Sequence, residues 1–417
     1  MKIEKITARE ILDSRGNPTV AATVYLADGV MAEASVPSGA STGATEAVEL
    51  RDTTAKRFSG QGVMGAVSNI EKIIGPSLVG QDASFQQKID KIICDLDGTP
   101  EKKKLGANAT LAVSLAVARA QATSDDLELF EYLSVKYRGS FGKNFALPTP
   151  MFNILNGGKH ADNNIDIQET MIVPVGLKTF ADKLRAGSEI YHALRGSLAS
   201  EGYETGLGDE GGFAPSLKDN EEVFHYLQSA VTDAGYNLNK IRISLDVAAD
   251  SLYNPKSNTY ILEGGKKDFD AHRFIKLIFS WVKKYHLFSV EDGLAEEDKK
   301  WPELTKTIAP ALSIGDDLFT THSDKINEGV KNHLANGVII KPNQVGTLTE
   351  AFQAIKVAQK NKFKVIISHR SGETEDSFIA DLAVAVGADF IKSGAPARSE
   401  RLAKYNRLLK IEEMISK

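Results

Sequence analysis

Six short apolar runs in the second half of the sequence each end in a charged or imidazole side chain. In order they are IRISLD, LFSVE, LSIGD, GVIIK, KVIISH and ADFIK, which end at Asp246, Glu291, Asp316, Lys341, His369 and Lys392. One charged residue after an apolar run is usually the solvated start of a loop. Six in succession favour a common chemical role, which requires elements that bring them together.

The spacing of these runs predicts the elements that position them. Successive end residues are 45, 25, 25, 28 and 23 positions apart, and about 25 residues accommodate one strand, one helix and short loops. Repeated units with almost continuously apolar strands are typical of a parallel (β/α) barrel. Because the carboxyl ends of all barrel strands face one mouth, the six side chains are expected to meet there.

Three of the six side chains are carboxylates, which suggests a metal site. Like charges held close together repel and raise one another's pKa values. A hard divalent cation relieves this repulsion, and oxygen-only ligands favour Mg²⁺ or Mn²⁺ over zinc. The alternative is that the three acids form salt bridges with Lys341 and Lys392.

Lys341 is the candidate general base. A lysine beside a metal ion in a water-poor mouth has a lowered pKa, because the cation repels the ammonium charge and burial disfavours it. The neutral amine can then remove a proton next to a metal-bound carboxylate, where the ions stabilise the enediolate charge that develops.

Two further acids lie in glycine-rich or polar stretches upstream. TGLGDEGGFAP carries Glu210, and NGGKHADNNIDIQETM carries His160, Gln168 and Glu169. Two neighbouring carboxyl groups separate their pKa values, so that one stays protonated at neutral pH and can serve as a general acid. A glycine-rich acidic turn is by itself most often only a turn, so the assignment depends on the two stretches meeting.

The stretch SHRSGETED adds a candidate anion-binding site. Arg370 and Ser371 stand at a strand end, where a guanidinium and a hydroxyl suit a phosphate or carboxylate. The acids Glu373, Glu375 and Asp376 are expected in the first turn of the next helix, where they would favour its dipole.

The first part of the chain has a different pattern. TVAATVYLADGVMAEASV predicts two strands joined by a turn at Asp28-Gly29, and NATLAVSLAVARAQA predicts a buried helix. Glycines and prolines in YRGSFGKNFALPTP mark a boundary. We therefore expect an α/β protein with an N-terminal α+β domain over residues 1–138 and the barrel over residues 139–417. The loop PSGASTG, with Ser41, is a candidate lid that closes over a substrate and joins a metal ion.

Composition excludes several classes of partner. A net charge of −5 over 417 residues gives no basic field for nucleic acid or an anionic membrane. The single cysteine, Cys94, excludes an internal disulfide and fits a reducing cytoplasm. The charged N-terminus does not resemble a signal peptide, and no apolar run reaches the ~18 residues of a membrane span. These features predict a cytoplasmic protein that acts on a small molecule.

Taken together, the motifs resemble those of enolases, and most of all the bacterial ones. The resemblance runs in order along almost the whole chain, through ILDSRGNPTV, PSGASTG, LNGGKHADNN, IQE, GDEGGFAP, SLD, SVEDG, GDDLF, KPNQVGTLTE, SHRSGETEDSFIADL and GAPARSERLAKYNRLLKIEE. It implies an N-terminal α+β domain on a modified (β/α)8 TIM-type barrel whose opening departs from strict alternation. A lysine or histidine base with one or two Mg²⁺ ions is the pattern already described for this superfamily.

The resemblance also implies an activity and a set of roles. It implies a hydro-lyase, phosphopyruvate hydratase, which reversibly converts 2-phospho-D-glycerate to phosphoenolpyruvate in glycolysis with two Mg²⁺ ions per active site. Lys341 would remove the C2 proton, and Glu210, with Glu169 beside it, would protonate the leaving C3 hydroxyl. The metal ligands would be Asp246, Glu291, Asp316 and Ser41, and the substrate contacts would be His160, Gln168, Glu169, Lys341, His369, Arg370, Ser371 and Lys392.

The resemblance extends to assembly and location. Enolases are usually dimers and some bacterial members are octamers, so a homodimer or octamer is expected. Enolases are also reported at bacterial cell surfaces without a signal peptide. A secreted or cell-surface fraction that binds plasminogen is therefore an alternative, additional role, with the terminal Lys417 as the contact.

Three positions depart from the family pattern. Pro342 follows Lys341 where Val or Phe is more usual, Thr170 replaces an aromatic residue, and Asp250 stands where Ser is common. Proline favours an extended Lys341, which a strand end already has. Among rival functions, another barrel lyase would lack PSGASTG and GDEGG, and a Schiff-base aldolase would not need three metal-type acids. A non-catalytic binding protein would have lost Lys341 or Glu210.

Overall fold

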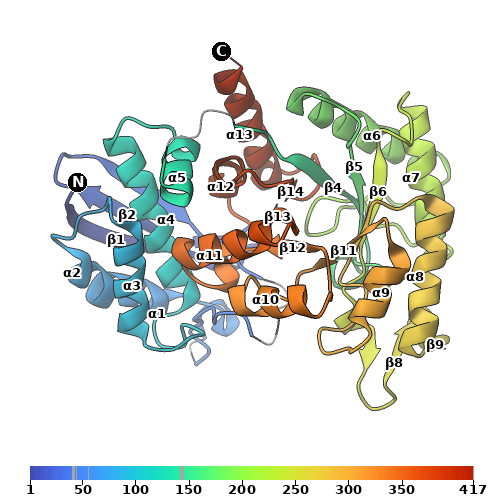
Figure 1. Ribbon diagram of the computed structural model, residues 1–417, viewed down its shortest axis with the longest axis horizontal. Coiled ribbons are helices and arrows are strands. Elements are labelled where there is room, and N and C mark those ends of the chain that lie inside the picture. The colour runs from blue at the N-terminus through green and yellow to red at the C-terminus, as the bar shows by residue number, and fades with distance from the viewer. Residues whose placement is uncertain (40–42, 44, 55, 141–144, 417) are drawn as a thin grey trace.

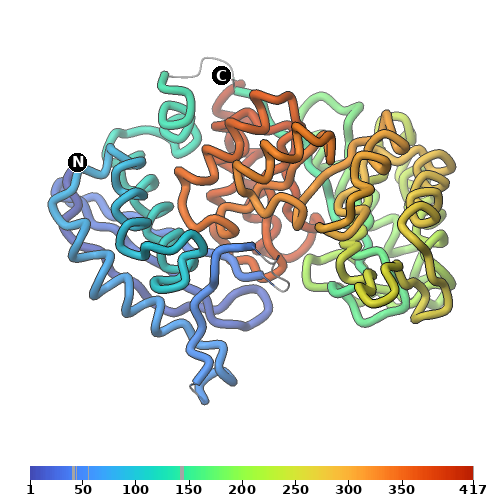
Figure 2. The backbone as a smooth tube through the Cα atoms, turned by 60° about the horizontal axis from the view of Figure 1, so that its bottom comes forward, coloured from blue at the N-terminus to red at the C-terminus, as the bar shows by residue number. Residues whose placement is uncertain are grey.

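The structure is a computed structural model that describes residues 1–39, 43, 45–54, 56–140 and 145–416. Its N-terminal part lies beside a larger barrel (Figure 1). Figure 2 shows the same arrangement from a second direction. In both views the red C-terminal segments lie between the blue N-terminal part and the green and yellow segments.

The N-terminal part is a three-stranded antiparallel sheet with packed helices. The strands, in sheet order, are β1 (Ile3–Leu12), β2 (Pro18–Leu26) and β3 (Met31–Ser35). The predicted hairpin is confirmed: β2 and β3 pair around a turn in which Gly29 has a φ of 85°, a conformation that favours glycine. The helices are α1 (Met64–Asn69), α2 (Gly75–Leu78), α3 (Gln86–Asp97), α4 (Ala107–Ser124) and α5 (Leu129–Arg138).

Helix α4 is the buried helix that the sequence predicts. Nearly all of its residues are inaccessible to solvent, and a helix that is apolar on most faces needs partners on each of them. The strands β2 and β3 are one partner, and the barrel is another, because Thr110 donates to the carbonyl of Gly346 at 2.8 Å. On α3, the buried Asp90 accepts the backbone N–H of Thr349 at 3.0 Å. These contacts fix the loop and helix that follow Lys341.

The rest of the chain forms a closed eight-stranded barrel. In order around it the strands are β10 (Ser289–Glu291), β11 (Leu312–Gly315), β12 (Gly337–Ile340), β13 (Lys364–Ser368), β14 (Phe390–Lys392), β4 (Thr149–Asn156), β5 (Glu169–Val173) and β6 (Arg242–Asp246). Strand β5 runs antiparallel to both neighbours, and the other pairs are parallel. The predicted fold, an N-terminal domain followed by a modified barrel with an irregular opening, is confirmed.

Helices surround the barrel on its outer face. They are α6 (Phe180–Ser200), α7 (Glu222–Asp233), α8 (Ala271–Tyr285), α9 (Trp301–Ile308), α10 (Ser323–Lys331), α11 (Leu348–Lys360), α12 (Phe378–Val386) and α13 (Ser399–Ile415). A small antiparallel sheet of β7 (Tyr253–Asn254), β8 (Thr259–Leu262) and β9 (Lys267–Phe269) precedes α8. This sheet accounts for the long interval between the ends of β6 and β10.

The barrel interior has an apolar floor below a polar mouth. The floor is a cluster of buried side chains from Met151, Met171, Val173, Ile314, Ile339, Ile366 and Phe390. Because side chains alternate along a strand, Glu169 lies on the same face of β5 as Met171 and Val173. The strands therefore end in polar groups that stand on a dry, packed base.

The three acids of the GETED stretch lie before α12 rather than in its first turn, contrary to the prediction. Asp376 pairs with Arg119 of α4 at 2.7 Å and accepts the backbone N–H of Ser35 at 2.9 Å. Glu373 pairs with the buried Lys404 of α13 at 2.8 Å. Two of these acids form ion pairs with distant elements, and Asp376 also accepts the backbone N–H of Phe378, the first residue of α12, at 2.8 Å.

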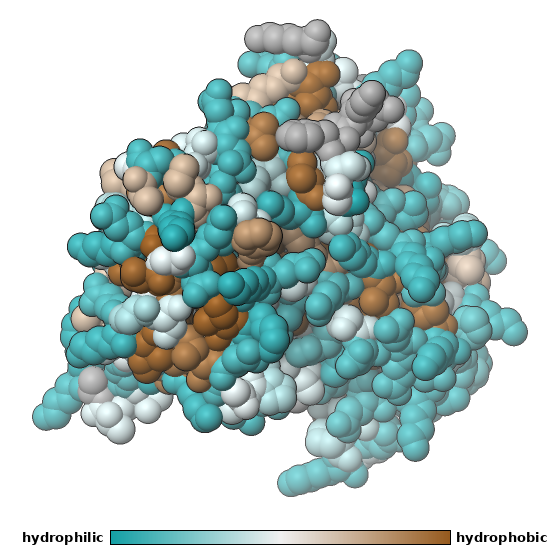
Figure 3. All heavy atoms as spheres, turned by 60° about the vertical axis from the view of Figure 1, so that its left-hand side comes forward, coloured by the Kyte–Doolittle hydropathy of each residue, from teal (hydrophilic) through white to brown (hydrophobic). Residues whose placement is uncertain are grey.

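The surface of the N-terminal part is mostly hydrophilic. Figure 3 turns this side forward and shows hydrophobic side chains in separate groups among hydrophilic ones. Its exposed apolar residues include Leu12, Met31 and Phe85. Across the described residues, no helix is both long and apolar enough to cross a membrane.

The packing of α6 on the barrel predicts opposite effects of one substitution at two glycines. A Cβ at Gly187 would lie 2.6 Å from Cε2 of Phe152, a fully buried ring on β4. Gly187→Ala should therefore lower the free energy of unfolding by about 1–3 kcal/mol. Gly196 on the same helix has nothing within 4 Å of such a Cβ, so Gly196→Ala should raise it by about 0.5–1 kcal/mol. Urea unfolding measures both, and equal effects would contradict this packing.

Candidate active site

The barrel mouth contains a cavity of about 190 Å³. Eleven of the thirteen predicted site residues line it, namely His160, Gln168, Glu169, Glu210, Asp246, Asp316, Lys341, His369, Arg370, Ser371 and Lys392. Glu291 is fully buried and lies against Lys392. Ser41 lies outside the described residues. The topology thus brings distant parts of the sequence to one place.

Lys392 joins three carboxylates at the centre of the mouth. Its Nζ lies 2.9 Å from Glu291 Oε1 and 3.0 Å from both Asp246 Oδ2 and Glu169 Oε2. Burial by itself lowers the pKa of this ammonium group, but the carboxylates, Asp246 foremost, hold the pKa well above its usual value. Burial and the charge of Asp246 raise the pKa of Glu291. Three carboxyl groups therefore share the single ammonium group of Lys392, which can balance only one negative charge.

Lys341 forms a close ion pair with Asp316. Burial lowers the pKa of Lys341, but the charge of Asp316 outweighs burial and raises it. The sequence predicts a lowered pKa, which requires a second cation beside this pair. The backbone of Lys341 is extended, with a φ of −123°, and its N–H donates to Thr321 Oγ1 at 2.9 Å. Pro342 therefore leaves the strand end undisturbed.

Two acids that the sequence analysis missed complete the acidic side of the mouth. Asp292 accepts the backbone N–H of Asp316 at 2.9 Å and that of Asp317 at 2.8 Å. Burial and the charge of Asp316 raise the pKa of Asp317 to about 7. Each missed acid directly follows a strand-end acid, in SVEDG and GDDLF. Strand alternation would turn Asp292 away, but its φ of 41° takes the chain out of the strand.

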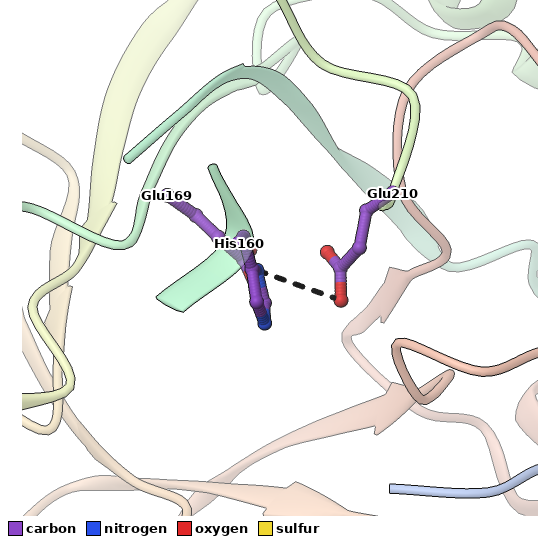
Figure 4. A group of neighbouring side chains, drawn as sticks. All are labelled: His160, Glu169 and Glu210. Atoms are coloured by element: carbon purple, nitrogen blue, oxygen red, sulfur yellow. Dashed lines mark ion pairs between the residues drawn. The ribbon is translucent and has the colours of Figure 1, made fainter. Parts of the chain in front are cut away.

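A histidine stands beside the two predicted acid groups on the other side of the mouth (Figure 4). Nδ1 of His160 lies 3.5 Å from Glu169 Oε1 and 3.8 Å from Glu210 Oε1. Burial and the charge of Glu210 raise the pKa of Glu169 well above its usual value. Burial acts the same way on Glu210, but His369 and His160 outweigh it and hold the pKa of Glu210 well below its usual value. The two pKa values are therefore separated, with that of Glu169 the higher.

Glu210 is oriented by groups on its other oxygen. Nδ2 of Asn153 donates to Glu210 Oε2 at 2.9 Å, and Nε2 of His369 lies 3.3 Å from the same oxygen. Asn153 is buried on β4 and is a site residue that the sequence analysis missed. It precedes the conspicuous LNGG motif, so no motif marked it.

Arg370, the predicted phosphate ligand, pairs with an acid from the N-terminal part. Its Nη1 lies 2.7 Å from Glu46 Oε2, and both side chains are buried. The charge of Glu46 outweighs burial and raises the pKa of Arg370. Glu46 also accepts the backbone N–H of Gly43 at 2.9 Å. The active site is therefore built from both parts of the chain.

Two family models match the chain. One, described as "Enolase, N-terminal domain", matches residues 3–133, and the other, described as "Enolase, C-terminal TIM barrel domain", matches residues 144–417. The chain belongs to the enolase family. This membership confirms the resemblance seen in the motifs and makes the protein a lyase of the enolase type.

The acids of this enolase fit a divalent cation. Carboxylates from three neighbouring strand ends converge on the mouth, and they outnumber the lysines among them. Asp292, Asp316 and Asp317 bring possible ligand atoms within 4.8 Å of one another, whereas Asp246 and Glu291 converge on Lys392. The salt bridges with Lys341 and Lys392, which were the alternative to a metal site, are thus present. The carboxylates still outnumber these lysines, and their oxygens are the donors that Mg²⁺ prefers.

Two of the departures from the family pattern differ in their relation to the site. Asp250 lines the cavity and accepts the backbone N–H of Glu296 at 3.2 Å, and burial raises its pKa. Thr170 follows Glu169 on β5 and therefore points away from the mouth; it is fully buried. Of the two, Asp250 is the one placed to affect ligands.

The acidic mouth predicts that Mg²⁺ stabilises the folded protein. A ligand that binds only the folded state at 100 times its Kd raises the free energy of unfolding by about 2.7 kcal/mol. Glu291→Gln removes a buried carboxylate and should reduce this gain, whereas Glu328→Gln, on the exposed side of α10, should not. Thermal unfolding with and without Mg²⁺ measures the effect, and an equal gain in both variants would contradict this assignment.

Proposed function

We propose that this enolase catalyses the reversible dehydration of 2-phospho-D-glycerate to phosphoenolpyruvate. The observation that carries the proposal is that Lys341 and the acid pair Glu169 and Glu210 line one cavity. Removing a proton from one carbon and a hydroxide from the next requires a base and an acid on the same substrate. Lys341 would supply the base and Glu210 the acid, among largely buried side chains whose charges interact strongly.

The cationic groups of the mouth suit an anionic substrate. Arg370 and Ser371 would bind the phosphate, because a guanidinium donates two parallel hydrogen bonds to phosphate oxygens. The other proposed substrate contacts are His160, Gln168, His369 and Lys392, all of which line the cavity. The pairing of Arg370 with Glu46 fixes the guanidinium before substrate arrives.

Lys341 would act as the base at C2. Its pKa is raised mainly by Asp316, with a smaller contribution from Glu291, so burial lowers it once these acids are engaged by another cation. The neutral amine then takes the C2 proton, and the electrons of the C–H bond enter the enediolate formed with the substrate carboxylate. The hydrogen bond from the backbone N–H of Lys341 to Thr321 Oγ1 fixes the backbone that carries this side chain.

Glu210 would act as the acid at C3. In this proposal the proton shared by Glu169 and Glu210 starts on Glu169. A second negative charge beside Glu210 would raise the pKa of Glu210 and favour transfer of the proton to it. As the electrons of the enediolate form the C2–C3 double bond, the C3–O bond breaks and Glu210 protonates the departing hydroxyl. Water is released and phosphoenolpyruvate remains.

Mg²⁺ is the proposed cofactor, with two ions per active site. Asp246, Glu291 and Asp316 would hold the first ion, and Ser41 would contribute to the second. When bound, the metal neutralises the substrate carboxylate and stabilises the enediolate charge. The acids of the mouth hold these positions on strand ends, which are rigid elements suited to precise placement.

Turnover should depend on Lys341 and on Mg²⁺. Lys341→Ala removes the base and should lower kcat by about 10²–10⁴-fold, and EDTA should abolish turnover. The matched control is Lys364→Ala at the opposite end of the barrel, where Lys364 pairs with Asp389 and is half exposed. The assay follows phosphoenolpyruvate by its ultraviolet absorbance after addition of 2-phosphoglycerate. Full activity of Lys341→Ala, or no turnover by folded wild-type protein with Mg²⁺, would refute the proposal.

A further inference from the structure

Arg401 is a fully buried arginine on α13, behind the loops of the active site. It donates to the carbonyl oxygens of Arg370 at 2.6 Å, Ser371 at 2.7 Å and Asp209 at 3.2 Å. These carbonyls belong to two separate loops, one that carries the predicted phosphate ligands and one that carries Glu210. A single guanidinium therefore sets the relative position of both loops.

The same guanidinium contacts the imidazole of His369. Its Nη1 lies against Nδ1 of the ring. A guanidinium has only N–H donors, whereas a neutral imidazole has one donor and one acceptor, and an imidazolium has two donors. The contact with Arg401 therefore requires Nδ1 to be the acceptor, which places the ring proton on Nε2.

The other ring nitrogen of His369, Nε2, faces a hydrogen-bond acceptor. Nε2 of His369 lies 3.3 Å from Oε2 of Glu210, which as a carboxylate accepts hydrogen bonds only. The opposite tautomer would set an N–H against the guanidinium and a lone pair against the carboxylate. Burial lowers the pKa of His369 to about 4; Glu210 and Glu373 oppose this, and Arg401 adds to it. The ring is therefore neutral at neutral pH.

We propose that Arg401 is a positioning residue that fixes His369 as the neutral Nε2–H tautomer and directs that N–H at Glu210. The inference rests on the proposed function for its consequence, since Glu210 is the acid of that reaction. Asn153 donates to the same oxygen at 2.9 Å, and Nε2 of His369 lies 3.3 Å from it. Both groups therefore lie beside Oε2, and Oε1 lies on the side of His160. Arg401 thereby orients the proton-donating oxygen without touching the substrate.

The tautomer is measurable without substrate. Protein labelled with ¹⁵N in its histidines, with the His369 signals assigned by their loss in His369→Gln, should show at pH 7 an unprotonated Nδ1 and a protonated Nε2. Signals of a protonated Nδ1 in the wild type would overturn the proposal. This first measurement needs no variant of Arg401 and so does not depend on whether one folds.

Variants then test the role of Arg401 itself. Arg401→Met removes the donor, and the His369 nitrogens should shift toward the average of two tautomers. Arg401→Lys keeps a donor-only cation and should retain the wild-type tautomer. Arg407→Met is the matched control on the same helix, because Arg407 pairs with Asp381 and Glu128 instead. Unchanged His369 signals in folded Arg401→Met would overturn the proposal.

Kinetics separate this inference from the proposed function. A misdirected Glu210 should lower kcat of Arg401→Met by about 10²-fold with little change in KM, and Arg401→Lys should recover part of the loss. A wild type with the expected tautomer but no turnover of 2-phosphoglycerate would refute the proposed function and leave the tautomer assignment standing. Normal kcat in an Arg401→Met variant with mixed tautomers would overturn the positioning role.

Discussion

The charge balance of the barrel mouth is the constraint on which the rest of the structure depends. Carboxylates from neighbouring strand ends are held within a few ångströms of one another in a dry interior, where an uncompensated charge is costly. Lys341 and Lys392 offset part of this charge and are themselves held by it. Each proton or cation that binds in the mouth therefore changes the pKa values of its neighbours.

The surrounding elements serve to hold these charges in place. The apolar floor keeps water away from below, and the strand ends fix the direction of each acid. The N-terminal domain contributes Glu46 to the guanidinium of Arg370, and α13 contributes Arg401 to the loops above. A site that receives side chains from the first domain, the barrel and the last helix has little freedom to rearrange.

Much of the fold and of the site could be predicted from the sequence, because a barrel converts a regular spacing into a common direction. The apolar runs with charged ends gave the parallel strands and the convergence of Asp246, Lys341 and Lys392. The resemblance implied only a barrel opening that departs from strict alternation, and the antiparallel direction of β5 was not predicted, since no spacing encodes strand direction. Asp292 was missed because an unusual φ turns its side chain, and the partner of Asp376 was missed because Arg119 lies 257 positions away in the sequence.

The contacts between the two domains bear on how the protein unfolds. Asp90 accepts the backbone N–H of Thr349 in α11. Arg119 forms an ion pair with Asp376, and Glu46 forms one with the buried Arg370 of the barrel. Separation of the domains would carry each of these polar groups into water or leave it buried without its counterpart. We therefore expect the two domains to unfold as one thermodynamic unit, with the slowest-exchanging amide hydrogens in both of them.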